Sequence, residues 1–350
     1  NDQVFKLHEA NPRLMPYYIG DKRLITLMMK LDCDVAVMTL DDLENFYIKR
    51  SYIRKDIEYV YAFHHMTSTH LVCTKEAFDH YDTVLCVGPH QKAELERAGE
   101  MRDIPRRNLV ECGYDLLDRQ IAEGAGSRRP VVLVAPSWQE DCLLDLCADE
   151  VLEPLLGRGF SVIVRPHPEY TKRYHARWES LQQRYASWSR DDIYFEQDFS
   201  TSDSVYDADV LVTDWSSIAC EFSFTTMKPC VFVDTPMKVT NPDWEELGIE
   251  PADLAIRNQI GASLAMEELP RLGDVVEDMV ARPEAWRNRI EEVRSRMIYH
   301  KGRGGEIAGA YLLDRMLAKQ GDRAVEASGA SRLDRAGVAG WIDEEVRHAG

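Results

Sequence analysis

Short β-branched runs alternate with longer stretches of mixed polar and apolar residues, and this pattern limits the fold more than any other feature of the sequence. Runs such as DVAVMTL, VVLVAPSW and DVLVTDW are short, apolar and rich in valine, which is typical of buried strands. The intervening stretch HQKAELERAG carries apolar residues at helical spacing and ends at Gly99. The alternation predicts βα units around parallel sheets. The predicted strands cover residues 16–20, 34–40, 59–65, 83–88, 109–115, 131–138, 161–168, 192–197, 209–215 and 230–234.

The chain has 350 residues, and single cores rarely grow beyond about 250–300 residues, so two domains are expected. The stretch EGAGSRRP, residues 123–130, has the composition of a linker. We therefore expect an N-terminal α/β domain over 1–122 and a C-terminal α/β domain over 131–320. The latter ends in helices from about Leu264 to Gln320, and residues 321–350 form a tail. The predicted fold class is α/β, with two doubly wound, Rossmann-like domains.

Composition limits the classes of partner and the cellular compartment that the sequence suggests. The formal charge of −18, from 42 Lys and Arg against 60 Asp and Glu, argues against nucleic acid as a partner. The eight cysteines show neither CxxC pairs nor zinc-type spacing, so buried thiols in a reducing cytoplasm are expected. The sequence has no signal peptide and no run of about 18 apolar residues, so no membrane-spanning segment is expected. It begins with Asn1 rather than Met, and we expect it to be part of a longer protein.

One turn between two predicted strands concentrates hydroxyl groups. In VLVTDWSSIACEF, Asp214, Ser216 and Ser217 follow a strand and precede a predicted helix. A helix N-terminus offers unpaired N–H groups and a partial positive charge, which suits a phosphate. Ser and Asp are also the preferred N-cap residues. Taken alone, this segment fits either a phosphate site or a helix cap.

Other strand ends carry polar side chains as well. SVIVRPHP ends with Arg165 and His167, each followed by a proline that holds the backbone extended. VVLVAPSW ends with Pro136 and Ser137. The strand over 59–65 leads into a polar loop that contains His64, His65, Thr67, Ser68, Thr69 and His70. Because open α/β sheets bind ligands at the carboxyl ends of their strands, a cleft lined this way suits a nucleotide diphosphate donor.

Several familiar motifs are missing. No GxxxxGK[ST] or GxGxxG occurs, which argues against a P-loop ATPase and a dehydrogenase. The loop histidines lack HExxH spacing, and Asp32 and Asp34 precede a strand rather than follow one. We therefore expect that no metal or other cofactor is required. The basic run over 287–305 is either a contact for a polyanionic acceptor or lipid headgroup, or a solvated helix face.

Together, HHMTSTH, APSW, RPHP and VTDWSS followed by Glu221 resemble the CDP-glycerol glycerophosphotransferase family, over about residues 30 to 320. The resemblance implies two facing α/β domains of the GT-B type. Three features depart from the family pattern: Met66 replaces a glycine, Glu221 replaces an aspartate, and no arginine follows Asp115. The family motifs fall on His65, Met66 and Thr67; on Pro136 and Ser137; on Arg165, His167 and Pro168; and on Asp214, Ser216, Ser217 and Glu221.

The resemblance also implies a reaction, in which an acceptor hydroxyl attacks the glycerol-side phosphorus of CDP-glycerol and expels CMP. His65 would be the general base, while Arg165 and His167 would neutralise the pyrophosphate, with His167 as an alternative proton donor. Ser216 and Ser217 would hold the diphosphate, and Glu221 would hold a ribose hydroxyl or orient a basic neighbour. Thr67 and Asp214 fall on donor-binding motifs, and Pro136 and Ser137 would line the nucleotide pocket.

The family builds teichoic acids and related bacterial cell-wall polymers, which implies a polyol-phosphate or lipid-linked acceptor. It also implies a cytoplasmic location with peripheral contact to the cytoplasmic face of the membrane. Two alternatives remain open from the residues alone. One is a GT-B transferase that uses another nucleotide-linked polyol or sugar. The other is a non-catalytic nucleotide-binding module, which Met66 and the missing arginine favour.

Overall fold

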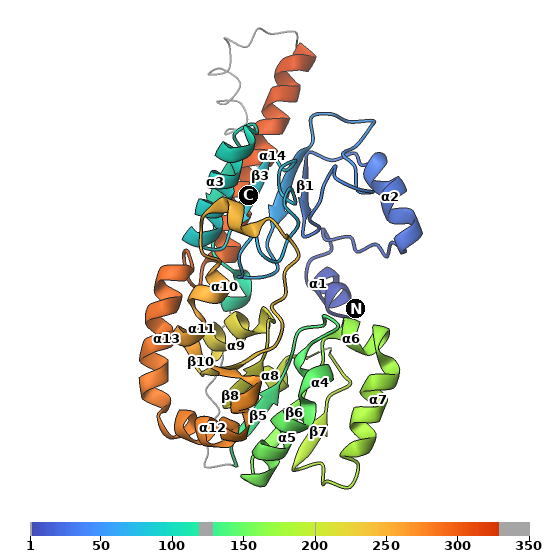
Figure 1. Cartoon of the computed structure of the whole chain (residues 1–350). Helices are drawn as coiled ribbons and strands as arrows, with labels where there is room; N and C mark the ends of the chain where they lie inside the picture. The colour runs from blue at the N-terminus through green and yellow to red at the C-terminus, as the bar shows by residue number, and fades with distance from the viewer. Residues whose placement is uncertain (1, 119–128, 200, 329–350) are drawn as a thin grey trace. The chain divides into compact units, whose positions relative to one another are not determined.

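The computed structural model describes residues 2–118, 129–199 and 201–328 (Figure 1). Residues 123–128 of the predicted linker and 329–350 of the predicted tail lie outside this range. The chain divides into two compact units, which are considered separately. The first comprises Asn1–Tyr61, Glu76–Asp82 and Arg315–Gly350, and the second comprises Ala62–Lys75 and Thr83–Asp314. The strands form parallel sheets of four and six strands.

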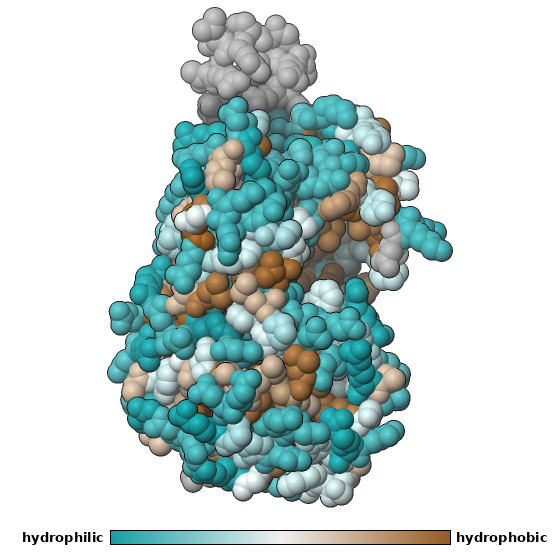
Figure 2. Space-filling view, in the orientation of Figure 1, coloured by the Kyte–Doolittle hydropathy of each residue, from teal (hydrophilic) through white to brown (hydrophobic). Residues whose placement is uncertain are grey.

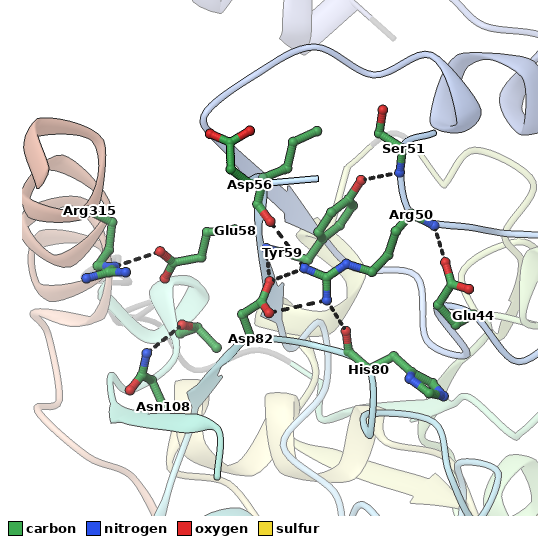
Figure 3. Close-up of polar contacts among 12 residues, drawn as sticks. Glu44, Arg50, Ser51, Asp56, Glu58, Tyr59, His80, Asp82, Asn108 and Arg315 are labelled. Carbon is green, nitrogen blue, oxygen red and sulfur yellow. Dashed lines mark hydrogen bonds and ion pairs between the residues drawn. The ribbon is translucent and has the colours of Figure 1, made fainter. Parts of the chain in front are cut away.

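The first unit contains the helices α1 (Asp2–Ala10) and α2 (Asp21–Met29) and the strand β1 (Val35–Met38). β1 pairs in parallel with β2 (Glu58–Ala62), with Val35 opposite Glu58. An ion pair of 2.6 Å between Arg50 and Asp82 braces β2, because Asp82 also accepts the N–H of Tyr59 at 2.8 Å (Figure 3). The guanidinium of Arg50 lies 4.5 Å from the centre of the Tyr59 ring.

The second unit contains the parallel pair β3 and β4 and the six-stranded sheet, whose order is β10-β9-β8-β5-β6-β7. Its strands are β3 (Thr83–Cys86), β4 (Asn108–Glu111), β5 (Val131–Val134), β6 (Ser161–Val164), β7 (Ile193–Phe195), β8 (Val210–Thr213), β9 (Cys230–Asp234) and β10 (Gly261–Ala265). Numbered from β5 as the first strand, the order of the larger sheet is 3-2-1-4-5-6, which is the Rossmann order. Such strands are buried on both faces, and accordingly every residue of β8 is buried.

Helices surround these strands (Figure 1). α5 contacts β6, α9 contacts β8, and α11 contacts β10. The α-helices of the second unit are α3 (Pro89–Arg102), α4 (Leu143–Leu146), α5 (Ala148–Gly157), α6 (Pro168–Arg173), α7 (His175–Arg184), α8 (Asp203–Asp207), α9 (Ile218–Thr226), α10 (Ala252–Ala255), α11 (Arg257–Ile260), α12 (Leu272–Ala281) and α13 (Pro283–Met297). The last helix, α14 (Gly304–Ser328), begins in the second unit and from Arg315 onward belongs to the first. Three short 3₁₀ helices are η1 (Asp115–Asp118), η2 (Trp244–Leu247) and η3 (Met266–Arg271).

Most of the elements predicted from the sequence are present, including the helices after residue 88 and after Ser217 and the mainly helical region from Leu264 onward. Two predictions were wrong: residues 16–20 form no strand, and β10 was not foreseen. All eight cysteines are free thiols, and all are buried except the partly exposed Cys33. No helix among the described residues is long and apolar enough to cross a membrane.

Candidate active site

The strand order fixes where a ligand is expected to bind. β5 and β8 lie side by side at the centre of the six-stranded sheet, and the chain leaves them toward opposite edges. A sheet of this kind binds ligands in the crevice beyond the carboxyl ends of these two strands. The segment after β5 contains Pro136 and Ser137, and the segment after β8 contains Asp214, Ser216 and Ser217. Five residues predicted from the sequence therefore meet at the switch point of the sheet.

Asp214 ties the two segments together. Its side chain is buried, and it accepts the backbone N–H groups of Ser137 at 2.7 Å, Leu143 at 2.9 Å and Trp215 at 2.6 Å. Both of its carboxylate oxygens are thus occupied by the protein's own donors. The geometry assigns Asp214 to shaping the site, whereas the prediction had it contact the donor directly.

The helix that follows begins without a side-chain cap. α9 starts at Ile218, and Ser217 at its N-cap position makes no capping hydrogen bond. The cap interpretation of this serine was therefore wrong. Ser216 and Ser217 are both partly exposed. A helix N-terminus left open in this way presents N–H donors and a positive dipole end to an anion.

Ser137 adds a further donor at the same place. The residue is only 2% exposed, and its hydroxyl oxygen has no hydrogen-bond partner within the described part of the chain. Buried hydroxyl groups are normally satisfied, and an exception calls for an explanation such as an absent ligand or water.

His167 lies at the end of the next strand, β6, as the N-cap of α6. Its Nδ1 accepts the backbone N–H of Glu169 at 3.1 Å. In the neutral ring the proton is then on Nε2, which is a hydrogen-bond donor. Burial lowers the pKa of His167, and the nearby charge of Lys238 lowers it further. His167 is accordingly a neutral donor near pH 7.

Arg165 is already engaged elsewhere in the protein. Its Nη1 lies 2.5 Å from a carboxylate oxygen of Glu196 and 3.1 Å from the hydroxyl of Ser204. Its Nη2 donates to the carbonyl of Thr201 at 3.0 Å. Both charged side chains of the ion pair are buried for the most part. These contacts hold the segments after β6 and β7 together, so Arg165 is not available to a pyrophosphate in this conformation.

The loop after β2 carries the other predicted histidine. His65 is buried, with Nδ1 2.7 Å from the hydroxyl of Thr67 and Nε2 3.8 Å from the thiol of Cys73. Burial is the main reason that the pKa of His65 falls to about 3, and the neighbouring His64 and His90 lower it further. His65 is thus neutral near pH 7, while the adjacent His64 is exposed.

A family model described as CDP-Glycerol:Poly(glycerophosphate) glycerophosphotransferase matches residues 67–245, which is more than half of the chain. The chain belongs to this family. The match contains every predicted site residue except His65. The protein is therefore a transferase of the CDP-glycerol glycerophosphotransferase family, and the family implies CDP-glycerol as the donor.

Solved structures show the same fold. The chain is similar to the UDP-GlcNAc 2-epimerase of Methanocaldococcus jannaschii in complex with UDP-GlcNAc and UDP, at 14% identity and a TM-score of 0.50, over 83% of this chain and 79% of that one. It is also similar to Acinetobacter baumannii MurG at 10% identity and a TM-score of 0.40, over 72% and 68%. The likeness to the epimerase supports a GT-B-like fold for this chain, which has two parallel sheets and C-terminal helices. No curated protein matches the chain.

In this glycerophosphotransferase, Glu221 lies in the first turn of α9, where Tyr114 donates to it at 3.3 Å. The same tyrosine hydroxyl lies 3.0 Å from the carbonyl oxygen of His64. Burial raises the pKa of Glu221. Tyr114 therefore links α9 to the loop that bears both histidines. The partner of Glu221 is a tyrosine, so the contact with a ribose hydroxyl and the orientation of a basic neighbour both stay predictions.

Three residues of the transferase site were not among the predicted site residues, although Trp138 belongs to the quoted motif APSW. Trp138, directly after Ser137, has its ring 6.1 Å from that of His167. Lys238 follows β9, and its Nζ lies 5.2 Å from the centre of the Trp138 ring. Arg257 of α11 donates to the carbonyl of Asp214 at 3.0 Å, pairs with Asp234 at 2.5 Å and stacks 4.0 Å from the Trp215 ring. Arg257 thus braces the segment that precedes α9.

A small cavity of about 20 Å³ adjoins these groups, which is room for about one water molecule. Among the residues lining it are Thr67, Asp214, Ser216, Lys238, Asp253 and Arg257. Thr67, from the loop after β2, therefore lies against the residues at the ends of β8 and β9. Within the described part of the chain, no group of three or more His, Cys, Asp or Glu side chains is placed to hold a metal ion.

Proposed function

We propose that the protein transfers glycerol phosphate from CDP-glycerol to a hydroxyl group of a lipid-linked or polymeric polyol-phosphate acceptor, in the synthesis of a teichoic-acid-like bacterial surface polymer. The observation that carries the site assignment is the open N-terminus of α9 at the switch point of a Rossmann-ordered sheet. The buried hydroxyl of Ser137, without a partner among the described residues, supports it. Both features suit the pyrophosphate of a nucleotide-linked donor.

In the proposed reaction, the acceptor oxygen bonds to the glycerol-side phosphorus while the bond from that phosphorus to the bridging oxygen breaks. The bridging oxygen leaves with the electron pair as part of CMP. Such a step depends mainly on positioning and on stabilisation of charge. Ser216, Ser217 and the N-terminus of α9 hold the diphosphate, and Nε2–H of His167 donates to the departing phosphate. No metal or other cofactor takes part in this scheme.

His65 is the proposed base that takes the acceptor proton, and Nε2 is the relevant atom. Its Nδ1 lies within hydrogen-bond distance of Thr67, whereas the partner of Nε2 among the described residues is the thiol of Cys73 at 3.8 Å. When Nδ1–H donates to Thr67, Nε2 carries the lone pair that accepts the proton. The low pKa of His65 makes it a weak base but keeps it unprotonated. The exposed His64 next to it is the competing candidate.

The proposed location is the cytoplasmic face of the membrane, where a lipid-linked acceptor would be reached without a spanning helix. Exposed aromatic side chains near the N-terminus support this contact, among them Tyr17 and Tyr18, which are 75% and 96% exposed. Figure 2 shows hydrophobic surface beside α2 in the same unit. Tyrosines of this kind are enriched where proteins meet the membrane–water interface.

The test is release of CMP from CDP-glycerol with a glycerol-phosphate-primed lipid analogue as acceptor. The parent should release CMP, and His167→Ala and His65→Ala should each lower kcat by at least about 100-fold if the two histidines act as proposed. His64→Ala decides between the two neighbouring histidines, and His175→Ala on the exposed face of α7 is the matched control. Competition with CDP-ribitol and with nucleotide sugars tests the donor. Binding of CDP-glycerol without release of CMP to any acceptor would contradict the proposal.

A further inference from the structure

Lys238 is a partly buried cation that forms no hydrogen bond or ion pair with the described residues. It lies four residues beyond the end of β9 and lines the same cavity as Ser216 and Thr67. Its ammonium group lies 5.2 Å from the centre of the Trp138 ring, and that ring lies 6.1 Å from the ring of His167. It is therefore close to residues from the ends of β5, β6 and β8.

The other charged side chains around this cavity all have partners. Asp214 accepts three backbone N–H groups, Asp253 accepts the N–H of Ser68 at 2.9 Å, and Arg257 pairs with Asp234 at 2.5 Å. Lys238, in contrast, forms no hydrogen bond or ion pair with the described residues; its one specific contact is the face of Trp138. A partly buried ammonium group without a direct ion pair keeps its hydrogen-bond donors available, so a lysine at this position points to an anionic ligand.

The pKa shifts of Lys238 and of the two histidines also support a role for Lys238 in the site. Burial lowers the pKa of Lys238, against the opposing effects of Asp214, Cys73 and Asp253. The charge of Lys238 in turn lowers the pKa of His167, second only to burial, and it contributes to the low pKa of His65. The charge of Lys238 therefore acts on both proposed catalytic histidines.

We propose that Lys238 binds the phosphate groups of the nucleotide donor between the N-terminus of α9 and Trp138, and neutralises the charge that develops on the departing CMP phosphate. This inference rests on the proposed function. It gives the site the cation that Arg165 does not supply, because Arg165 is paired with Glu196. A cation aimed at developing charge in a partly dehydrated site contributes more to catalysis than the same charge in water.

The experiment compares Lys238→Met and Lys238→Arg with the parent, and uses Lys92→Met as the control because Lys92 is a partly exposed lysine of α3 that is paired with Glu111. The measurements are kcat and KM for CDP-glycerol, the Kd for CDP, and the melting temperature. Lys238→Met should lower kcat/KM by about 100-fold or more, as the loss of one such charge-stabilising group typically does. It should weaken CDP binding at least about ten-fold, while Lys238→Arg keeps part of both. Melting temperatures should not fall, since Lys238 forms no ion pair within the part of the chain that the structure describes.

The pH dependence separates this role from a structural one. His167 is faced by Lys238 and Lys172, which lower its pKa, and by Glu169, which raises it; Arg173 lies 4.9 Å from the Trp138 ring. The limb of the pH profile of kcat/KM that reports His167 is the one that disappears in His167→Ala. Loss of the Lys238 charge should raise the pKa of His167, so this limb should move to higher pH in Lys238→Met. A purely structural lysine would lower activity without moving that limb.

The outcomes keep the two proposals apart. If the parent binds CDP but releases no CMP from CDP-glycerol, the proposed function fails, and the effect of Lys238→Met on CDP binding alone decides the role of the lysine. If Lys238→Met binds CDP and turns over like the parent, the inference is wrong. It is also wrong if activity falls only together with the melting temperature and the pH profile stays in place.

Discussion

At the scale of single residues, Asp214 illustrates how a site can be shaped by a side chain that does not touch the ligand. Its carboxylate accepts N–H groups from Ser137, Leu143 and Trp215 and is 1% exposed. Asp214→Asn replaces one acceptor oxygen with an NH₂ group that faces these donors. Each buried donor left unsatisfied costs about 1–3 kcal/mol, so we expect the free energy of unfolding to fall by about 2–4 kcal/mol.

Urea unfolding at pH 7 measures this change, with Asp191→Asn as the control. Asp191 is exposed in the loop before β7, so its substitution should alter the free energy of unfolding by less than about 0.5 kcal/mol. Equal effects of the two substitutions would show that Asp214 does not hold the site together.

The residues of the candidate site show which of its parts can be predicted from the sequence. Ser137, Asp214 and Ser216 were predicted because short polar side chains after apolar runs are a local pattern, and the structure brings them together at the switch point. Lys238 and Arg257 were missed, since a single basic residue outside a motif is common on any surface. Their significance depends on which aromatic rings and carboxylates lie beside them, and only the tertiary structure supplies that.

At the scale of elements, the N-terminus of α9 is the part of a helix that the proposed function assigns to the diphosphate of the donor. A serine that caps a helix contributes about 1 kcal/mol, but Ser217 makes no capping bond. We therefore expect Ser217→Ala to leave the free energy of unfolding within about 0.5 kcal/mol of the parent, while it raises the KM for CDP-glycerol about ten-fold by removing a phosphate donor. Urea unfolding and steady-state kinetics on the same preparations measure both.

A loss of stability of about 1 kcal/mol with an unchanged KM would restore the cap interpretation of Ser217 and remove it from the donor site. Thr226→Ala at the other end of the same helix is a suitable control. The Thr226 hydroxyl donates to the carbonyl of Phe222 at 2.6 Å, so its loss should affect stability rather than KM.

Elements also show where local pattern fails. Residues 16–20, PYYIG, have strand-like composition, yet Tyr17 and Tyr18 are exposed and the segment pairs with no strand among the described residues. β-Propensity describes fitness for a half-buried pleated surface, which this segment does not occupy. β10 is the opposite case, because GASLA has weak strand propensity but pairs with β9 along its whole length. At Gly261 the backbone approaches that of Cys230 closely, and an added Cβ would lie 1.9 Å from the carbonyl oxygen of Cys230. This position therefore requires a glycine.

At the scale of the whole molecule, charge and exposed apolar surface are unevenly distributed along the chain. Residues 1–61 carry 9 Lys and Arg against 10 Asp and Glu, a formal charge of −1, so the remaining residues hold −17 of the total of −18. Most of the large exposed apolar side chains among the described residues lie between residues 4 and 53. An acidic protein is repelled by anionic lipid, so membrane contact through the N-terminal residues would depend on their apolar and aromatic side chains.

This distribution predicts how the protein should bind vesicles. Sedimentation with phosphatidylcholine vesicles should recover the protein with little dependence on salt, and addition of phosphatidylglycerol should not strengthen binding. Replacement of both Tyr17 and Tyr18 by serine should weaken binding about ten-fold, because burying large apolar side chains contributes about 1.5–3 kcal/mol each when complete. Trp188→Ser, which removes an exposed aromatic side chain from the second unit, should leave binding unchanged. Binding that requires anionic lipid and disappears at high salt would instead assign the contact to basic residues such as those over 287–305.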